Sequence, residues 1–282
     1  MSEVSHGSKG SLTKRGTFKL PKSNLPYYGQ AIGILMFEID TPRARATPEA
    51  ADFPLKMETF TRIPGDVGNA TTFDFPVQFK VMKGVVAGDV VYRNPTKETE
   101  KKIVEYTKEL EREGVRAIGT TCGFMSYFQP VMAAAVDIPV FSSSLLQVPI
   151  VSSLIGGDRT VGIITFNSRE LSKEHLTRVG IDNSIPISIF GLEGLPAERS
   201  WYGISEVEPE KRFELIEDRV VYAATQLISE NPNVGAIVLE CTNLPPASAA
   251  VQNATGLPVF DVVTLLNWAY DSVVRKRFWG FV

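Results

Sequence analysis

Short apolar runs alternate with longer amphipathic segments along most of the chain. Runs rich in branched residues predict buried strands, and segments with apolar positions three or four residues apart predict helices. We expect strands at residues 31–36, 77–91, 115–121, 138–141, 160–166, 234–240 and 257–260. We expect helices at residues 97–113, 129–136, 208–229, 246–254 and 264–277, and a further one with Ser168 as its N-cap. This alternation predicts an α/β fold with parallel sheets that carry helices on both faces.

The sequence contains an internal repeat. Cys241 lies 119 residues after Cys122, and Pro258 lies 119 residues after Pro139. The segments VRAIGTTC and VGAIVLEC, which end at the two cysteines, share a valine, an alanine, an isoleucine and the cysteine itself. The repeat predicts two copies of a strand–helix–strand unit, each with a cysteine just after a strand. Because parallel strands end at one edge of a sheet, both thiols are expected at the carboxyl edge, where open sheets bind ligands.

The repeat divides the chain into two lobes. The first lobe is expected at residues 27–145, completed by a C-terminal helix at residues 264–282, and the second at residues 146–263. Residues 1–26 begin with a stretch rich in Ser, Gly and Lys and are expected to form a flexible N-terminal extension. We therefore predict two related lobes with a ligand cleft between them.

Composition and charge exclude several classes of protein. Of the 282 residues, 44% are hydrophobic and 22% are charged, as in ordinary globular proteins. The formal net charge of −3 gives little attraction for nucleic acid. The sequence has no apolar run of the roughly 20 residues that a membrane span needs, and its first residues lack the apolar stretch of a secretory signal. We expect a cytoplasmic protein without nucleic-acid or membrane partners.

The two cysteines, Cys122 and Cys241, are too few for a disulfide scaffold or a four-thiolate zinc site, and we expect no metal. Two thiols that face one cleft suit the removal of a proton from a carbon next to a carboxylate and its delivery on the opposite side. One cysteine must then be a thiolate. Its pKa has to be lowered from about 8.5 by the start of the helix that follows it.

Other interpretations of the cysteines exist. Each cysteine taken alone also fits a small buried side chain. A nucleophilic cysteine paired with histidine has little support, because His6 lies in the N-terminal extension and we expect His175 to be solvated on a helix. The polar neighbours of the cysteines favour a catalytic role, as donors of hydrogen bonds to a substrate carboxylate or its enolate. These neighbours are Thr121, Gly123, Thr242 and Asn243.

The segments GTTCGFMSYF around Cys122 and LECTNLPP around Cys241, with IGILM at the first strand, resemble the aspartate/glutamate racemase superfamily. That superfamily includes hydantoin racemases, maleate cis-trans isomerases and arylmalonate decarboxylases, and the resemblance runs from about Gln30 to the C-terminus. It implies two pseudo-symmetric flavodoxin-like lobes with a cofactor-independent active site in the cleft between them. It also implies one cysteine from each lobe as acid or base, and a homodimer.

The resemblance implies residues that hold the substrate. The stretch PVFSSSLLQV, followed by RTVGIITFNS, is similar to the carboxylate-holding segment of the maleate isomerase and decarboxylase branch. This similarity points to Ser143, Ser144 and Asn167. Phe124, in the first cysteine motif, joins the substrate-binding set.

Departures from the family pattern bear on the substrate. Glutamate racemases typically have a histidine where this chain has Asn243, and their first-strand acid is replaced by the segment FEID, which contains Glu38 and Asp40. These departures argue against a racemase of the glutamate type. The presence of both cysteines argues against the decarboxylase branch, which keeps only the second.

We expect a cofactor-independent racemase or epimerase, an isomerase that inverts a carbon next to the carboxylate of a small amino acid or related acid. One alternative is a maleate-type cis-trans isomerase, in which Cys122 adds to an unsaturated diacid as a nucleophile and Cys241 serves as the acid. Another is a non-catalytic protein whose cleft closes on a small acid.

Three weaker features each have a plain interpretation and a functional one. The loop PGDVGN at residues 64–69 is either a turn or a set of N–H donors for a carboxylate. Trp201 and Tyr202 either cover the cleft or are buried where the lobes meet. The charges of the helix at residues 208–229 are expected to form a solvated face rather than a metal or acid pair.

Overall fold

The computed structural model describes residues 26, 29–39, 63–92, 95–201, 204 and 207–278. The predicted N-terminal extension at residues 1–26 lies outside these residues apart from Pro26, and so do Asp40 and Tyr202. Across the described part of the chain, no helix combines the length and the apolar character needed to cross a bilayer.

The strands form two four-stranded sheets in which every pair is parallel. The first sheet has the order β2-β1-β3-β4 and the second the order β6-β5-β7-β8, so the second repeats the arrangement of the first. The strands are β1 (Ile32–Phe37), β2 (Val77–Met82), β3 (Ala117–Thr120), β4 (Val140–Phe141), β5 (Thr160–Thr165), β6 (Ile187–Gly191), β7 (Val234–Leu239) and β8 (Val259–Phe260). The shared order confirms the predicted α/β fold with two related lobes.

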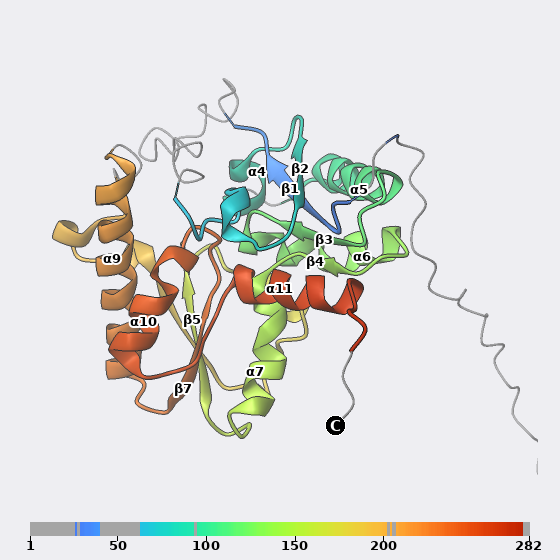
Figure 1. The fold of residues 1–282 in the computed structure, drawn as a ribbon. Coiled ribbons are helices and arrows are strands. Elements are labelled where there is room, and N and C mark those ends of the chain that lie inside the picture. Colours follow the sequence, from blue (N-terminus) through green and yellow to red (C-terminus); the bar gives the residue numbers. More distant parts are fainter. Residues whose placement is uncertain are drawn as a thin grey trace, which may run out of the picture.

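Helices surround both sheets (Figure 1). The α-helices are α4 (Ala87–Val91), α5 (Lys97–Arg112), α6 (Gln129–Ala135), α7 (Val148–Leu154), α8 (Lys173–Thr177), α9 (Pro209–Glu230), α10 (Ser248–Thr255) and α11 (Val262–Val273). The short 3₁₀ helices are η1 (Ala70–Thr72), η2 (Gly123–Phe128), η3 (Ser144–Gln147), η4 (Leu192–Gly194), η5 (Ala197–Arg199) and η7 (Pro245–Ala247). Two of the 3₁₀ helices, η2 and η7, follow closely on the two cysteines.

Most predicted elements are confirmed. The C-terminal helix, expected at residues 264–277 and assigned to residues 264–282 of the first lobe, ends at Val273. Strand β6 and helix α7 were not predicted. Two further segments differ from the prediction. The strand expected at residues 77–91 ends at Met82, and α4 occupies the rest of that segment. Ser168 is not a helix N-cap, because no helix begins directly after it; its N–H and hydroxyl both donate to the Glu193 carboxylate. The helix of this region, α8, begins after Ser172 instead.

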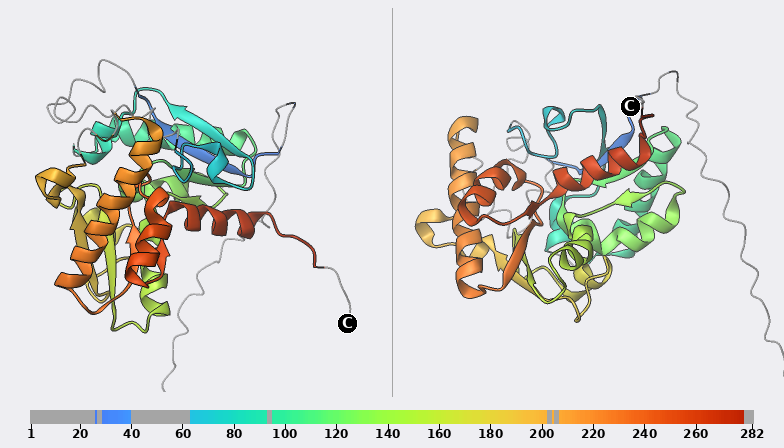
Figure 2. Two further views of the ribbon diagram at one scale, coloured as in Figure 1. Left: turned by 60° about the vertical axis from the view of Figure 1, so that its left-hand side comes forward. Right: turned by 60° about the horizontal axis from the view of Figure 1, so that its bottom comes forward.

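Helices α7 and α11 cross between the sheets, because each packs on the sheet other than the one whose last strand precedes it. Helix α7 follows β4 but contacts β5, and α11 follows β8 but lies along the first sheet, as Figure 2 shows. Leu266 of α11 packs so closely on Gly119 of β3 that a Cβ there would lie 2.7 Å from its Cδ2. At the crossing, the Gln147 side chain donates to the Asp261 carbonyl (2.8 Å) and accepts from the Thr264 hydroxyl (2.9 Å). This exchange ties the two lobes together.

A continuous apolar core also joins the lobes. It includes Leu35 and Ile118 from the first sheet, Phe128 after the first cysteine, and Val161 and Val238 from the second sheet, all buried. Since one core serves both sheets, their carboxyl edges are held in a fixed relation.

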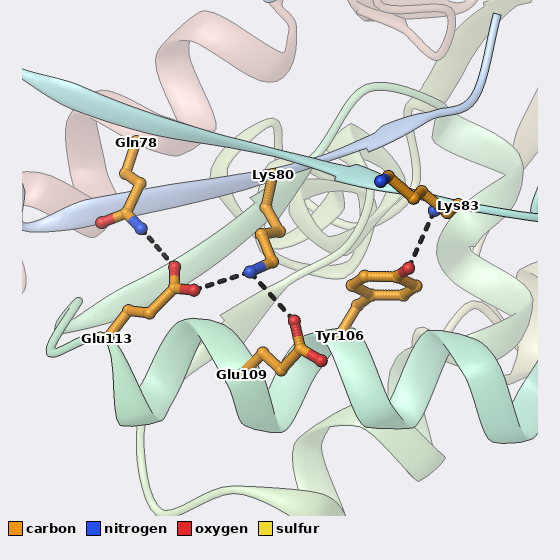
Figure 3. Close-up of polar contacts among 6 residues, drawn as sticks. All are labelled: Gln78, Lys80, Lys83, Tyr106, Glu109 and Glu113. Carbon is orange, nitrogen blue, oxygen red and sulfur yellow. Dashed lines mark hydrogen bonds and ion pairs between the residues drawn. The ribbon is translucent and has the colours of Figure 1, made fainter.

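Polar contacts hold α5 against the edge strand β2 (Figure 3). The Lys80 ammonium lies 2.9 Å from Glu109 and 2.6 Å from Glu113. The Gln78 amide donates to Glu113, and the N–H of Lys83 donates to the Tyr106 hydroxyl at 3.0 Å. Charges on an edge strand discourage pairing with another chain, so we assign this cluster a structural role.

Candidate active site

The two cysteines line one pocket. Strand β3 ends at Thr120 and β7 at Leu239, so each thiol follows its strand by two residues and lies at a carboxyl edge. The pocket has a cavity volume of about 60 Å³, which suits a small molecule. Seven of the residues expected at the site line it: Thr121, Cys122, Gly123, Phe124, Cys241, Thr242 and Asn243.

Aromatic side chains form much of the pocket wall. They are Phe37, Tyr92, Phe124, Phe166 and Trp201, and they come from both lobes. Such rings provide an apolar surface and, through their faces, an electrostatic attraction for cations.

Buried arginines of α9 hold the segment that carries Trp201, which is only 3% exposed and lines the pocket. Arg219 donates to the Ser200 carbonyl at 2.7 Å, and Arg212 donates to the carbonyls of Ile204 (3.1 Å) and Val207. The expectation of a fully solvated charged face on this helix is therefore wrong for these two arginines, which anchor part of the pocket wall.

Glu240 adds a buried carboxylate to the pocket. The Thr165 hydroxyl donates to its Oε2 at 2.8 Å, while Oε1 has no hydrogen-bond partner among the described residues. The carboxylate lies against Gly123 of the other lobe, where a Cβ would fall 2.0 Å from Oε1. Burial raises the pKa of Glu240 to about 7. A charged residue beside Cys241 is visible in the sequence, but the contact of Glu240 with Gly123 could not be predicted from it.

The thiols are harder to ionise than the sequence predicted. Burial raises the pKa of both Cys122 and Cys241, and the negative charge of Glu240 raises both further. The main-chain N–H groups of Phe124 and Met125 lower the pKa of Cys122, as expected at a helix start, but by less than burial raises it. The expectation of a lowered thiol pKa is therefore wrong for the pocket without a ligand.

Asp66, in the loop at residues 64–69, is joined to the second cysteine through a side-chain amide. The Asn243 amide donates to Asp66 Oδ2 at 2.6 Å, and the Cys241 thiol donates to Asn243 Oδ1 at 3.7 Å. Burial raises the pKa of Asp66 to about 6. The loop's glycine N–H groups, considered as donors to a substrate, instead bond within residues 65–72, from Gly65 to Thr72 and from Gly68 to Asp66.

Ser143, Ser144 and Asn167, implied by the family resemblance, do not line this pocket. The Ser144 hydroxyl donates to the Leu239 carbonyl at 2.8 Å, and the Ser143 oxygen accepts from the N–H of Leu145 at 3.2 Å. Asn167 accepts from the N–H of Arg169 at 3.0 Å. The structure thus gives these three side chains main-chain partners, nearby in sequence for Ser143 and Asn167 and in strand β7 for Ser144.

Other side chains near the site also have internal partners. The hydroxyl of Thr121 donates to the Leu35 carbonyl at 3.3 Å, and that of Thr242 donates to the Thr121 carbonyl at 2.7 Å. Glu38 accepts from the N–H of Gly84 at 2.9 Å and does not line the thiol pocket. Hydroxyl donation to a substrate by these threonines requires the present bonds to break.

His175 is buried, so its predicted solvation is wrong. Its Nδ1 accepts from the N–H of Ser172 at 3.1 Å, and its ring meets Phe124 edge to face with 5.2 Å between centroids. Burial lowers the pKa of His175 to about 4. Its ring packs against Phe124, which lines the pocket. In the described ranges, no three His, Cys, Asp or Glu residues cluster as a metal site.

Known proteins are similar to this chain in sequence or in fold. The chain is 32% identical over 222 residues to a dimethylsulfoniopropionate lyase of Durusdinium sp. clade D, covering 77% of this chain and 73% of that protein. It is 31% identical over 225 residues to dimethylsulfoniopropionate lyase 3 of Emiliania huxleyi, covering 77% of this chain but only 57% of that protein.

A solved structure of an arylmalonate decarboxylase variant with associated sulfate matches at 15% identity, with a TM-score of 0.53, over 86% of this chain and 92% of that one. This likeness supports the two-lobed fold. The family model described as Asp/Glu/Hydantoin racemase matches residues 90–269, which include both cysteines. The chain belongs to the Asp/Glu/Hydantoin racemase family.

Proposed function

We propose that this protein is a cofactor-independent lyase that converts dimethylsulfoniopropionate to acrylate and dimethyl sulfide. The observation that carries the proposal is the pocket itself, in which two thiols, a buried carboxylate and an aromatic wall meet. We take the substrate from the names of two relatives, each called a dimethylsulfoniopropionate lyase.

The charge of the pocket favours a cationic substrate group. Aromatic faces attract cations, and the buried Glu240 carboxylate strengthens that attraction because little water screens it. A sulfonium bound here offsets the charge of Glu240, which is one cause of the raised thiol pKa values. Substrate binding therefore favours the thiolate that the chemistry needs.

The reaction is an elimination. A cysteine thiolate takes the proton from the carbon next to the substrate carboxylate and becomes a thiol. The electron pair of that C–H bond forms the new double bond, and the pair of the C–S bond leaves on sulfur as neutral dimethyl sulfide. The thiol then returns its proton to water. Since the leaving group needs no proton, one thiolate is sufficient for this step.

The substrate carboxylate requires donors as negative charge develops on it. The hydroxyls of Thr121 and Thr242 are occupied, so we assign this role to main-chain N–H groups of the two cysteine loops, at Gly123 and Thr242. Phe124 and Asn243, from the predicted set, take part as pocket wall.

The placement of the cysteines favours a second candidate, a racemase or epimerase. Cys122 and Cys241 come from different lobes and line the same pocket, as proton exchange on opposite faces of a carbon requires. Both candidates begin with loss of the same kind of proton. They differ in whether the intermediate expels a leaving group or takes up a proton.

The test offers the purified protein a panel of small acids. Dimethylsulfoniopropionate, the enantiomers of glutamate and aspartate, and maleate are supplied separately, with dimethyl sulfide measured by gas chromatography and the other products by NMR. We expect equal amounts of dimethyl sulfide and acrylate from dimethylsulfoniopropionate. Racemisation of an amino acid with no dimethyl sulfide would reject the lyase in favour of the second candidate.

A further inference from the structure

We infer that Asp66, acting through Asn243, holds Cys241 as a thiol and so assigns the role of base to Cys122. This inference deepens the proposed function, because an elimination needs one thiolate rather than two. The arrangement that carries it spans both lobes and joins residues 177 positions apart in the sequence. Its contacts are independent of which substrate is turned over.

The contacts form a chain of three side chains. Asp66 Oδ1 accepts from the N–H of Gly68 at 2.8 Å, and Oδ2 accepts from the Asn243 amide at 2.6 Å. The oxygen of the same amide faces Cys241, at 3.7 Å from its sulfur. Asp66 is 3% exposed, so bulk water contributes little to satisfying its carboxylate.

The donor and acceptor roles leave one consistent arrangement. An ionised carboxylate only accepts, so Asn243 must turn its NH₂ group towards Asp66. The amide oxygen then points to Cys241, and an amide oxygen also only accepts. The sulfur must therefore carry a proton. A thiolate at this position would face the negative end of the amide dipole.

Turning the amide over does not relieve this restriction. It would place the Asn243 oxygen against the Asp66 carboxylate, with two acceptors and no proton between them. The loop cannot easily withdraw either. Gly65, at a φ of 98°, packs against Pro246 beyond the second cysteine, and a Cβ there would lie 3.0 Å from the proline Cα. The Thr72 hydroxyl donates to the Asp66 carbonyl at 2.7 Å and fixes the loop from the other side.

The first cysteine has no equivalent side-chain acceptor. At the offset of 119 residues that aligns the cysteines, Phe124 corresponds to Asn243, and its ring has no oxygen to accept from a thiol. Two main-chain N–H groups, of Phe124 and Met125, favour the thiolate of Cys122, whereas Cys241 has one such donor, the N–H of Asn243, and also faces the amide oxygen of that residue. Asp66 is thus a positioning residue, acting on Cys241 only through Asn243.

The test compares the two thiols within the full-length protein. Alkylation by iodoacetamide is followed at Cys122 and Cys241 separately, by mass spectrometry of their peptides, from pH 7 to pH 10. In Asp66→Asn we expect Cys241 to react at least fivefold faster at pH 8, with its rate profile shifted to lower pH, because Asn243 is free to turn and donate to a thiolate. Cys122 should stay within twofold of wild type.

Asn243→Ala removes the amide oxygen directly and should also accelerate Cys241. The double variant distinguishes an effect of Asp66 that acts through Asn243 from a direct effect of its charge on the thiol. Once Asn243 is replaced, Asp66→Asn should raise the alkylation rate of Cys241 by less than a further twofold. Asp89→Asn, at another buried aspartate, is the matched control and should change neither rate.

Unchanged Cys241 rates in both single variants would overturn the inference, as would additive effects in the double variant or equal acceleration of Cys122. Because alkylation needs no substrate, this result stands apart from the lyase assay. Absence of dimethyl sulfide production with a Cys241-selective response would reject the proposed function alone.

Discussion

The two cysteine loops occupy the same place in two similar lobes, yet their surroundings differ in charge. At the offset of the repeat, Thr121 corresponds to Glu240 and Gly123 to Thr242. The first loop contributes small and aromatic neighbours, whereas the second contributes Glu240 and the amide that binds Asp66. The repeat thus brings two like thiols together, and their neighbours make them unequal.

This inequality also explains why Gly123 belongs in the first loop. The Glu240 carboxylate of the second loop occupies the space that a side chain at residue 123 would need. Each loop therefore completes the environment of the other. The predictions below test that division, from the largest expected effect to the smallest.

The largest effect is expected from removing the base. Cys122→Ala should lower kcat/KM for dimethyl sulfide release about 10³-fold or more, whereas Cys241→Ala, which removes a thiol rather than the thiolate, should lower it about tenfold to 10²-fold. Headspace assays of both variants at equal concentration measure the difference. A larger loss in Cys241→Ala would reverse the assigned roles.

The buried carboxylate of Glu240 should make stability depend on pH. Its pKa, about 7 in the folded protein against 4.5 ordinarily, means that the folded state binds more protons over this interval. The contribution of Glu240 to stability should therefore fall as pH rises from 4.5 to 7, by roughly 3 kcal/mol.

Urea unfolding of wild type and Glu240→Gln at several pH values tests this dependence. The difference between the two proteins isolates Glu240, because the other shifted groups are common to both. Asp66 and Asp261, with raised pKa values, act in the same direction as Glu240, whereas His175, with its pKa lowered to about 4, acts in the opposite direction. Cys122 and Cys241, the other titratable groups of the pocket, stay protonated in this range because their pKa values are raised. Parallel curves for both proteins would contradict the account.

Gly123→Ala probes the contact between the loops. The added methyl group meets Glu240 and should lower the free energy of unfolding by about 1–3 kcal/mol. Gly194→Ala is the matched control, because a Cβ there meets nothing within 4 Å. Combining Gly123→Ala with Glu240→Ala should recover part of the loss, and strict additivity would show that the two residues do not interact.

The smallest effect is expected at Asn167. Its side chain accepts a hydrogen bond from the N–H of Arg169, and it does not line the thiol pocket. Asn167→Ala should therefore keep KM for dimethylsulfoniopropionate within about twofold of wild type. A tenfold rise in KM would restore the substrate-binding role that the family resemblance implied.

The sequence predicted the fold where apolar runs and the repeat agreed. Strands β3 and β7 are buried runs that lead to the two cysteines, and their positions were clear. The strand predicted at residues 77–91 was too long. Its apolar residues Val85, Val86 and Val90 correctly indicate burial, but burial alone does not distinguish a strand from a helix. A five-residue helix such as α4 is too short to show a period.

The site was predictable only where its residues are neighbours in sequence. Cys122, Cys241 and the residues beside them could be placed from local motifs. Asp66 could not, because its contact with Asn243 crosses between lobes. The available signal was indirect, an aspartate in a glycine-containing loop and an asparagine where the resembled family has histidine.

The most direct test of the central claim is NMR of dimethylsulfoniopropionate in heavy water with wild type and the Cys122→Ala, Cys241→Ala double variant. Wild type should form acrylate and dimethyl sulfide in equal amounts, and the folded double variant should form neither. Two results would contradict the account. One is that folded wild type neither forms dimethyl sulfide nor exchanges the proton next to the substrate carboxylate; the other is that the double variant turns the substrate over as fast as wild type.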